Sequence, residues 1–189
     1  MGIYAGILNP EKEGKLLLRR RVEKHSIIPG KSFKGCWELP GGAVTATTES
    51  AIPYNYYLDD LIKNVKDRTG ISLSSPALPL MYLVLFKGSA GYDLAGVVIA
   101  IMAQEPTVEE TIYVSPKELA QLAKEFVPAD EKTGKDGVGL LSGEGKRMHC
   151  MALAALCHSP NLDYAQEAPE MLYQITKKWM RNIQFSNSG

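Results

Sequence analysis

The cysteines and histidines near the C-terminal end are the first residues whose types suggest chemistry. His149-Cys150 and Cys157-His158 combine thiols and imidazoles, which are the side chains that bind zinc. On a helix, however, Cys150 and Cys157 would stand two turns apart, roughly 10 Å along the axis, which is too far to ligate one ion. Cys36 has no histidine or aspartate partner at a spacing typical of a thiol nucleophile. We therefore expect the two helical cysteines to pack in the core, and no thiol chemistry at Cys36.

A row of side-chain oxygens is the second candidate. Asp60, Asn64 and Asp67 recur at helical spacing within residues 54–69, and Gly70 is a suitable helix stop. Apolar residues fall on the opposite side of the same segment: Leu58, Leu61, Ile62 and Val65. Such a row has two interpretations, and the commoner one is a solvated polar face opposite a core face. The other is an oxygen-rich stripe that ligates a hard cation.

The segment Trp37-Glu38-Leu39-Pro40-Gly41-Gly42-Ala43-Val44 resembles the entry to the Nudix box, and Gly70-Ile71 resembles its end. Nudix enzymes hydrolyse nucleoside diphosphates that are linked to another moiety. With the Ser115-Pro116 helix start, the resemblance extends over residues 3 to 126. It implies an α+β Nudix fold with a mixed β-sheet between α-helices (α/β/α). It also implies glutamates one turn apart on a helix, beside a glycine-rich loop, holding Mg²⁺ against a pyrophosphate.

The chain departs from the Nudix pattern along the helix. Aligned backwards from Gly70, Lys63 takes the arginine position, Asn64 takes the next glutamate position, and Asp67 and Arg68 take the final glutamate pair. One of the three helix carboxylates therefore remains. The guanidinium of Arg68 is expected to occupy space meant for a cation.

The beginning of the pattern departs as well. Counted from Gly42, Thr48 stands at the early glutamate position and Glu49 follows one residue late. The segment is also seven residues longer than the pattern. Seven residues are almost two helical turns, so the helix face keeps its phase while its start moves by roughly 10 Å.

The resemblance assigns candidate site residues. A Mg²⁺ or Mn²⁺ ion would be held by Asp67, Asp60 and Asn64. The catalytic candidates are Asp67, Glu49 and Glu144, the last as a general base from the late loop that also carries Asp130, Glu131 and Asp136. The ligand-binding candidates are Gly41, Gly42, Glu38, Lys34 and Arg21.

The basic candidates have simpler interpretations too. Lys31 and Lys34 precede the glycine loop and suit a phosphate, although ordinary surface lysines are the commoner case. Arg19 and Arg21 share one face of a strand at period two, and they either meet a nucleotide or are solvated at the strand end.

Two functions remain open. The first is a metal-dependent hydrolase of nucleoside diphosphate-linked compounds with a weakened or altered metal site. The second is a binding module that retains the Nudix pocket without hydrolysis and serves as a ligand sensor or an interaction subunit. Both imply a small nucleotide or nucleotide-sugar ligand, and the family resemblance implies a possible homodimer.

Composition limits the remaining possibilities. The 189 residues favour one domain, residues 1–185, followed by a polar tail at 186–189. Basic and acidic residues balance at 21 each, so no global field would attract nucleic acid or an acidic membrane. Three scattered cysteines and the absence of a basic, apolar leader favour the cytoplasm.

The pattern of apolar residues and turns predicts the elements that carry these groups. We expect a hairpin over 3–8 and 15–21, and a strand at 37–39 that is broken by 40–42. Further strands are expected at 81–87, 94–103 and 111–114. A helix capped by Ser115 should reach about residue 126, followed by a mobile loop at 128–145 and helices at 146–158 and 169–183.

Overall fold

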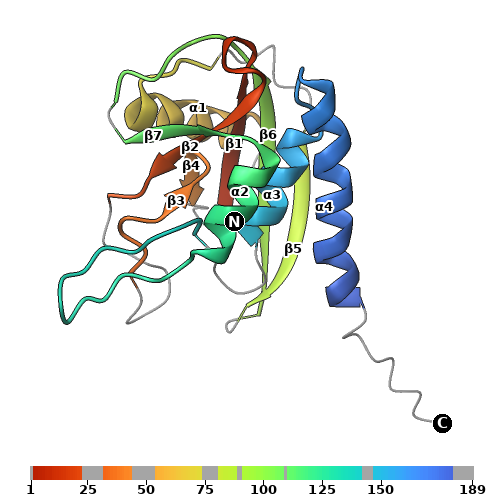
Figure 1. Cartoon of the computed structure of the whole chain (residues 1–189). Coiled ribbons are helices and arrows are strands. Elements are labelled where there is room, and N and C mark those ends of the chain that lie inside the picture. The colour runs from red at the N-terminus through yellow and green to blue at the C-terminus, as the bar shows by residue number, and fades with distance from the viewer. Residues whose placement is uncertain are drawn as a thin grey trace.

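A computed structural model describes residues 2–22, 32–43, 54–73, 81–88, 91–108, 110–141 and 147–180. Seven strands of this described chain form one sheet in which β1 and β6 are parallel and the other pairs are antiparallel (Figure 1). The strands are β1 (Gly2–Asn9), β2 (Lys15–Arg20), β3 (Trp37–Glu38), β4 (Gly41–Ala43), β5 (Met81–Gly88), β6 (Gly91–Ile101) and β7 (Thr111–Val114). The order is β3-β2-β1-β6-β5, with β4 also on β1 and β7 also on β2.

Strand β1 lies at the centre of the sheet, and all eight of its residues are buried. Ile3, Ala5 and Ile7 face one side, while Tyr4 and Leu8 face the other, as the two-residue period of a strand requires. A short 3-10 turn, Pro10–Lys12, joins β1 to β2. The predicted hairpin is thus confirmed.

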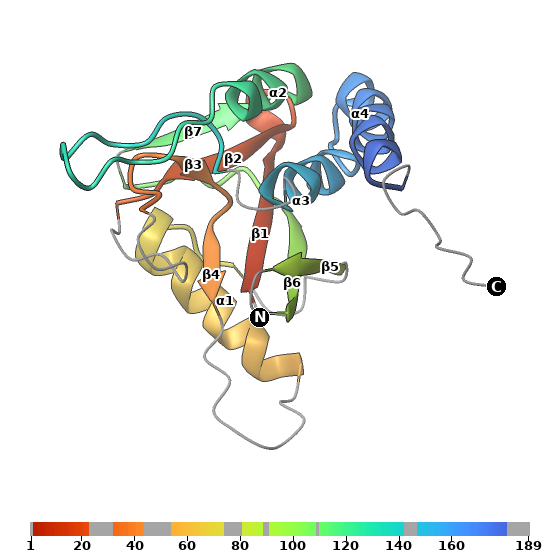
Figure 2. The same ribbon diagram turned by 90° about the horizontal axis from the view of Figure 1, so that it is seen from below.

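Helices cover both faces of the sheet (Figure 2). Helix α1 (Tyr54–Thr69) packs on the Ile3 side through Leu58, Leu61 and Val65. Helices α2 (Pro116–Lys124) and α3 (Arg147–Leu156) pack on the other side, and α4 (Leu162–Met180) packs on α3 as an outer layer. This arrangement confirms the predicted α+β class with a mixed sheet between helices. Within the described chain, no helix is both long enough and apolar enough to cross a bilayer.

The predicted start of α2 is confirmed in detail. The Ser115 hydroxyl accepts from the Glu118 amide, and the Glu118 carboxylate accepts from the Ser115 amide. This reciprocal capping box, with Pro116 in the first turn, fixes where the helix begins.

The predicted start of the last helix was wrong. Helix α4 begins at Leu162, seven residues before Pro169, and the proline lies inside it. The Asn161 side chain accepts from the Asp163 and Tyr164 amides, which makes Asn161 the N-cap. A proline favours the first turn of a helix and is costly in its interior, so Pro169 suggested a start, but the cap at Asn161 determines where α4 begins.

The structure adds detail to two loop predictions. The predicted break after the first short strand is present at Leu39 and Pro40, but it ends at Gly41, where β4 pairs with β1 directly after β3 has paired with β2. The described part of the 128–145 loop forms an arm in which Val127 bridges Val138 and Asp130 bridges Lys135 (Figure 1). The Asp130 carboxylate closes its turn by accepting from Lys132 and Thr133.

Candidate functional site

The glycine loop is shaped by its pairing with β1. Gly41 has φ +137°, and a Cβ there would collide with the carbonyl oxygen of Ile3. Only glycine combines this conformation with such a close approach. The Ala5 amide donates to the Pro40 carbonyl oxygen at 2.7 Å, which fixes the start of the loop. The Gly41 carbonyl oxygen is left facing helix α1, where Arg68 contacts it.

The flank of α1 beside this loop carries part of the predicted oxygen row. Leu61 and Val65 are buried, Asp60 and Asn64 are half-buried, and Asp67 is exposed. At 100° per residue, Asp67 points almost directly away from the core face, while Asn64 lies on the flank. The structure therefore brings Asn64 nearer to the sheet than Asp67, the residue favoured as both metal ligand and catalytic group.

Arg68 occupies the position closest to the loop. Its Nη1 atom donates to the Gly41 carbonyl oxygen at 2.6 Å, a charge-assisted hydrogen bond. Three atoms of its guanidinium would lie 3.4 to 3.8 Å from a Cβ built on Gly42. The guanidinium thus rests against both glycines.

A divalent ion does not fit the described residues at this loop. In the described ranges, no group of three or more His, Cys, Asp or Glu side chains is arranged to hold a metal ion. Two unit charges about 4 Å apart interact by about 4 kcal/mol at an effective dielectric constant of about 20, so a divalent ion beside Arg68 would meet roughly twice that repulsion. Asp60, Asn64 and Asp67 alone do not compensate for it.

A buried ion-pair cluster stands one strand away. The Glu38 carboxylate on β3 pairs with Arg19 and, at 3.0 Å, with Arg21 from β2. The Glu38 and Arg19 side chains are 2% and 5% exposed, and that of Arg21 is 21% exposed. Leu17 belongs to the α1-side core, so Arg19 and Arg21 continue on that side at period two. Strand-end solvation of Arg19, the simpler interpretation, was therefore wrong.

Tyr4 and Arg147 join this region from the other side of the sheet, and sequence reasoning missed both. Burial raises the pKa of the Tyr4 hydroxyl, Glu38 raises it further, and Arg147 lowers it in part through a hydrogen bond. Tyr4 stands among apolar strand residues and Arg147 begins α3, so neither carried a signal in the sequence.

The basic loop residues are engaged in ion pairs within the chain. Lys34 pairs with Asp136 at 3.0 Å, and Arg20 pairs with Asp136 and Glu110 at 3.6 Å. These contacts hold the 127–138 arm against the segment before β3. Asp136 and Asp130, two of the alternative general bases, thus have structural partners on this arm.

The predicted packing of the two helical cysteines is confirmed. Cys150 is buried, and Cys157 packs against the core on the α3 side of the sheet. Cys36 is buried as well, and burial raises the pKa of its thiol to about 11, so the thiol stays protonated at neutral pH. Neither observation supports thiol chemistry.

Several predicted residues lie outside the described part of the chain: Lys31, Thr48, Glu49 and Glu144. Their roles stay predictions.

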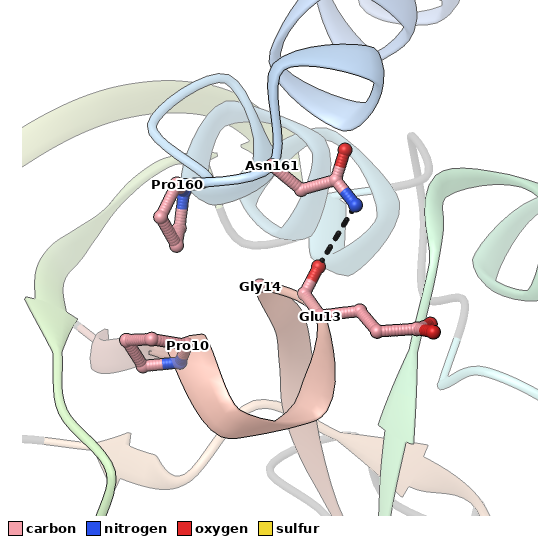
Figure 3. A pocket seen from close by; sticks show the side chains of 5 residues that line it. All are labelled: Pro10, Glu13, Gly14, Pro160 and Asn161. Carbon is pink, nitrogen blue, oxygen red and sulfur yellow. Dashed lines mark hydrogen bonds between the residues drawn. The ribbon is translucent and has the colours of Figure 1, made fainter.

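A separate depression of about 290 Å³ lies at the opposite end of β1, lined by Pro10, Glu13, Gly14, Pro160 and Asn161 (Figure 3). The Asn161 side chain spans it to donate to the Glu13 carbonyl oxygen at 3.0 Å. Its lining includes one carboxylate, that of Glu13, and two prolines, so these residues offer no cluster of groups suited to catalysis.

Comparison with known proteins gives fold-level similarity. No family model and no curated protein match the chain. Among solved structures, it is similar to the MutT protein from Methanosarcina mazei Go1, at 24% identity over 64% of this chain and 79% of that one, with a TM-score of 0.45.

Two further solved structures are similar to the chain. The Nudix domain of Shewanella oneidensis NrtR, complexed with ADP ribose, is 17% identical over 64% of this chain and 75% of that one, with a TM-score of 0.43. The Nudix hydrolase RenU from M. smegmatis is 20% identical over 64% and 73%, with a TM-score of 0.42. These likenesses concern the fold alone and carry no information on activity, substrate or partner.

Proposed function

We propose that this chain is a Nudix-like protein that binds the diphosphate of a nucleotide or nucleotide sugar at the glycine loop, with hydrolysis weak or lost. One observation carries the proposal: the charge in contact with Gly41 and Gly42 is the guanidinium of Arg68. A guanidinium binds phosphate oxygens without the geometry that a metal ion requires. It supplies no activated water, which a metal ion would provide.

The Arg19–Glu38–Arg21 cluster supports the same function. Since the Glu38 carboxylate is buried between two guanidinium groups, its proposed part is to orient them and not to contact the ligand. Arg21 is the more exposed of the two, so it is the proposed contact for a phosphate. Gly42, which lacks a side chain, lets the guanidinium of Arg68 lie against the loop where the ligand is proposed to bind.

Hydrolysis is the second candidate, and the Asp60–Asn64 row favours it. Both side chains are half-buried on the flank of α1 that leads to the loop. In this alternative, Glu49 and Glu144 complete a Mg²⁺ or Mn²⁺ site with Asp67. A homodimer and a cytoplasmic location accompany either function as expectations from the family resemblance and the composition.

Titration calorimetry with ADP-ribose, in EDTA and then in Mn²⁺, tests the proposal. We expect binding in EDTA, at least tenfold weaker binding by Arg21→Gln, and no product by chromatography after prolonged incubation with Mn²⁺. The matched control is Lys132→Gln, which removes a positive charge at the exposed tip of the arm and should leave affinity unchanged. Metal-dependent turnover abolished by Asp67→Ala would establish the hydrolase instead, and no binding in either condition would contradict both.

A further inference from the structure

We infer that Arg68 replaces the divalent cation at the glycine loop, so that a single side chain decides whether this site is metal-independent or metal-binding. The inference starts from the disagreement between the metal site that the sequence motif implies and the described residues, which do not fit a metal ion. It reaches beyond the proposed function because it predicts that one substitution creates a new metal site.

Contact geometry places the guanidinium where a cation would sit. Nη1 of Arg68 lies 2.6 Å from the Gly41 carbonyl oxygen. The absence of a side chain at Gly42 lets the planar group lie against the loop. Backbone carbonyl oxygens are also ligands for Mg²⁺, Mn²⁺ and Ca²⁺. Arg68 already donates to one of the two lone pairs of the Gly41 oxygen, and its positive charge would repel a cation at the other.

The position of Arg68 on α1 is the second line of evidence. Asp60, Asn64 and residue 68 follow one another at intervals of four along α1, the helix that meets β4. Arg68 lies in the last turn, where a positive charge is favoured by the helix dipole. A carboxylate at position 68 would extend the row of oxygens to the Gly41 carbonyl, while arginine ends that row in a cation.

This exchange has a consequence for the ligand that rests on the proposed function. A diphosphate at the loop would meet a fixed charge that needs no metal, so affinity should not change when divalent ions are removed. Arg68 then acts as a binding residue for the ligand.

Manganese alone, without any nucleotide, tests the central claim. Free Mn²⁺ is followed by its electron paramagnetic resonance signal during titration of the wild type, Arg68→Gln and Arg68→Glu. We expect no saturable site in the wild type, a measurable site in Arg68→Gln, and in Arg68→Glu a site at least tenfold tighter than in Arg68→Gln. The controls Lys66→Gln and Lys66→Glu make the same charge changes at an exposed position in the same helical turn, and they should bind as the wild type does.

Each outcome decides the question. Equal Mn²⁺ affinity in the wild type and Arg68→Glu would overturn the inference, as would the absence of a gain in both folded variants. Circular dichroism checks that each variant folds. If Arg68→Glu does not fold, the Mn²⁺ affinity of Arg68→Gln is compared with that of Lys66→Gln, and an affinity at least threefold higher in Arg68→Gln supports the inference.

A second arm separates this inference from the proposed function. ADP-ribose affinity of Arg68→Gln should fall at least tenfold in EDTA and recover with added Mn²⁺, while wild-type affinity is the same in both. If the wild type binds no ADP-ribose, the proposed function fails, and the manganese titration still judges the role of Arg68.

Discussion

The two ends of strand β1 are held in different ways. At the Asn9 end, neutral hydrogen bonds join the β1–β2 turn to the start of α4: the Ser159 hydroxyl donates to the Gly14 carbonyl oxygen at 2.7 Å, and Asn161 donates to Glu13 (Figure 3). At the Gly2 end, charged groups from β2, β3 and α1 gather around the glycine loop. We call the neutral hydrogen bonds at the Asn9 end, from Ser159 and Asn161 to Gly14 and Glu13, the clasp. The Gly2 end holds guanidinium groups instead.

This difference separates structural from functional polar groups. The start of a helix leaves backbone groups that need hydrogen-bond partners, and the neutral hydrogen bonds of the clasp provide them. Each such bond contributes only a modest net free energy to stability. Burying ion pairs costs desolvation, and apolar residues of similar volume often stabilise a fold equally well. The charged end is therefore where we expect the function to be.

The largest effect is expected from breaking the charged end at Glu38. Glu38→Gln leaves Arg19 buried without its carboxylate, so the free energy of unfolding should fall by about 3 kcal/mol. Urea denaturation measures this, with Glu105→Gln as the control because its pair with Lys12 is half-exposed and should contribute less than about 1 kcal/mol. Equal losses in the two variants would remove the distinction between the two ends.

An intermediate effect is expected at the loop backbone. Gly41→Ala places a Cβ against the Ile3 carbonyl oxygen at φ +137°, which should cost about 2 to 3 kcal/mol and weaken ADP-ribose binding. Gly134→Ala is matched, since Gly134 has φ +70° with open space around it, and about 1 kcal/mol is expected there. Thermal unfolding compares them, and a loop that tolerated Gly41→Ala as well as Gly134→Ala would not be shaped by β1.

The smallest effect is expected at the clasp. Ser159→Ala removes a buried hydroxyl that donates to Gly14 and accepts from the Asn161 amide, which should lower the free energy of unfolding by about 1 to 2 kcal/mol. ADP-ribose affinity should stay at the wild-type value, because the clasp lies at the far end of β1. Ser72→Ala, at an exposed position, is the control for stability. A loss of affinity in Ser159→Ala would show that the two ends are coupled.

Much of the fold followed from local sequence signals. Alternating or continuous apolar runs predicted the strands, and the Ser115 to Glu118 capping box predicted α2 to within two residues. The predicted start of α4 was wrong because it rested on Pro169, whereas the local signal for the true start is Asn161, an N-cap residue type followed by Asp163 in the first turn.

The candidate site followed from sequence only in part. The motif predicted the glycine loop and the conflict at Arg68, because its pattern relates positions that are 27 residues apart in the chain. The burial of Arg19 did not follow, since the strand period assigns a face but not the partner that neutralises it. Its pairing with Glu38 depends on the register between β2 and β3, and that of Tyr4 with Arg147 depends on how α3 docks.

The closeness of α3 to the sheet has a consequence for the evolution of this chain. A Cβ on Gly6 would collide with the Cβ of Ala155, so helix and central strand meet with only one methyl group between them. A larger side chain at one of these positions requires a smaller one at the other, and the space does not hold alanine at both. Relatives that share this docking should therefore covary at the two positions, and such a paired constraint would identify them even where the glycine loop has diverged.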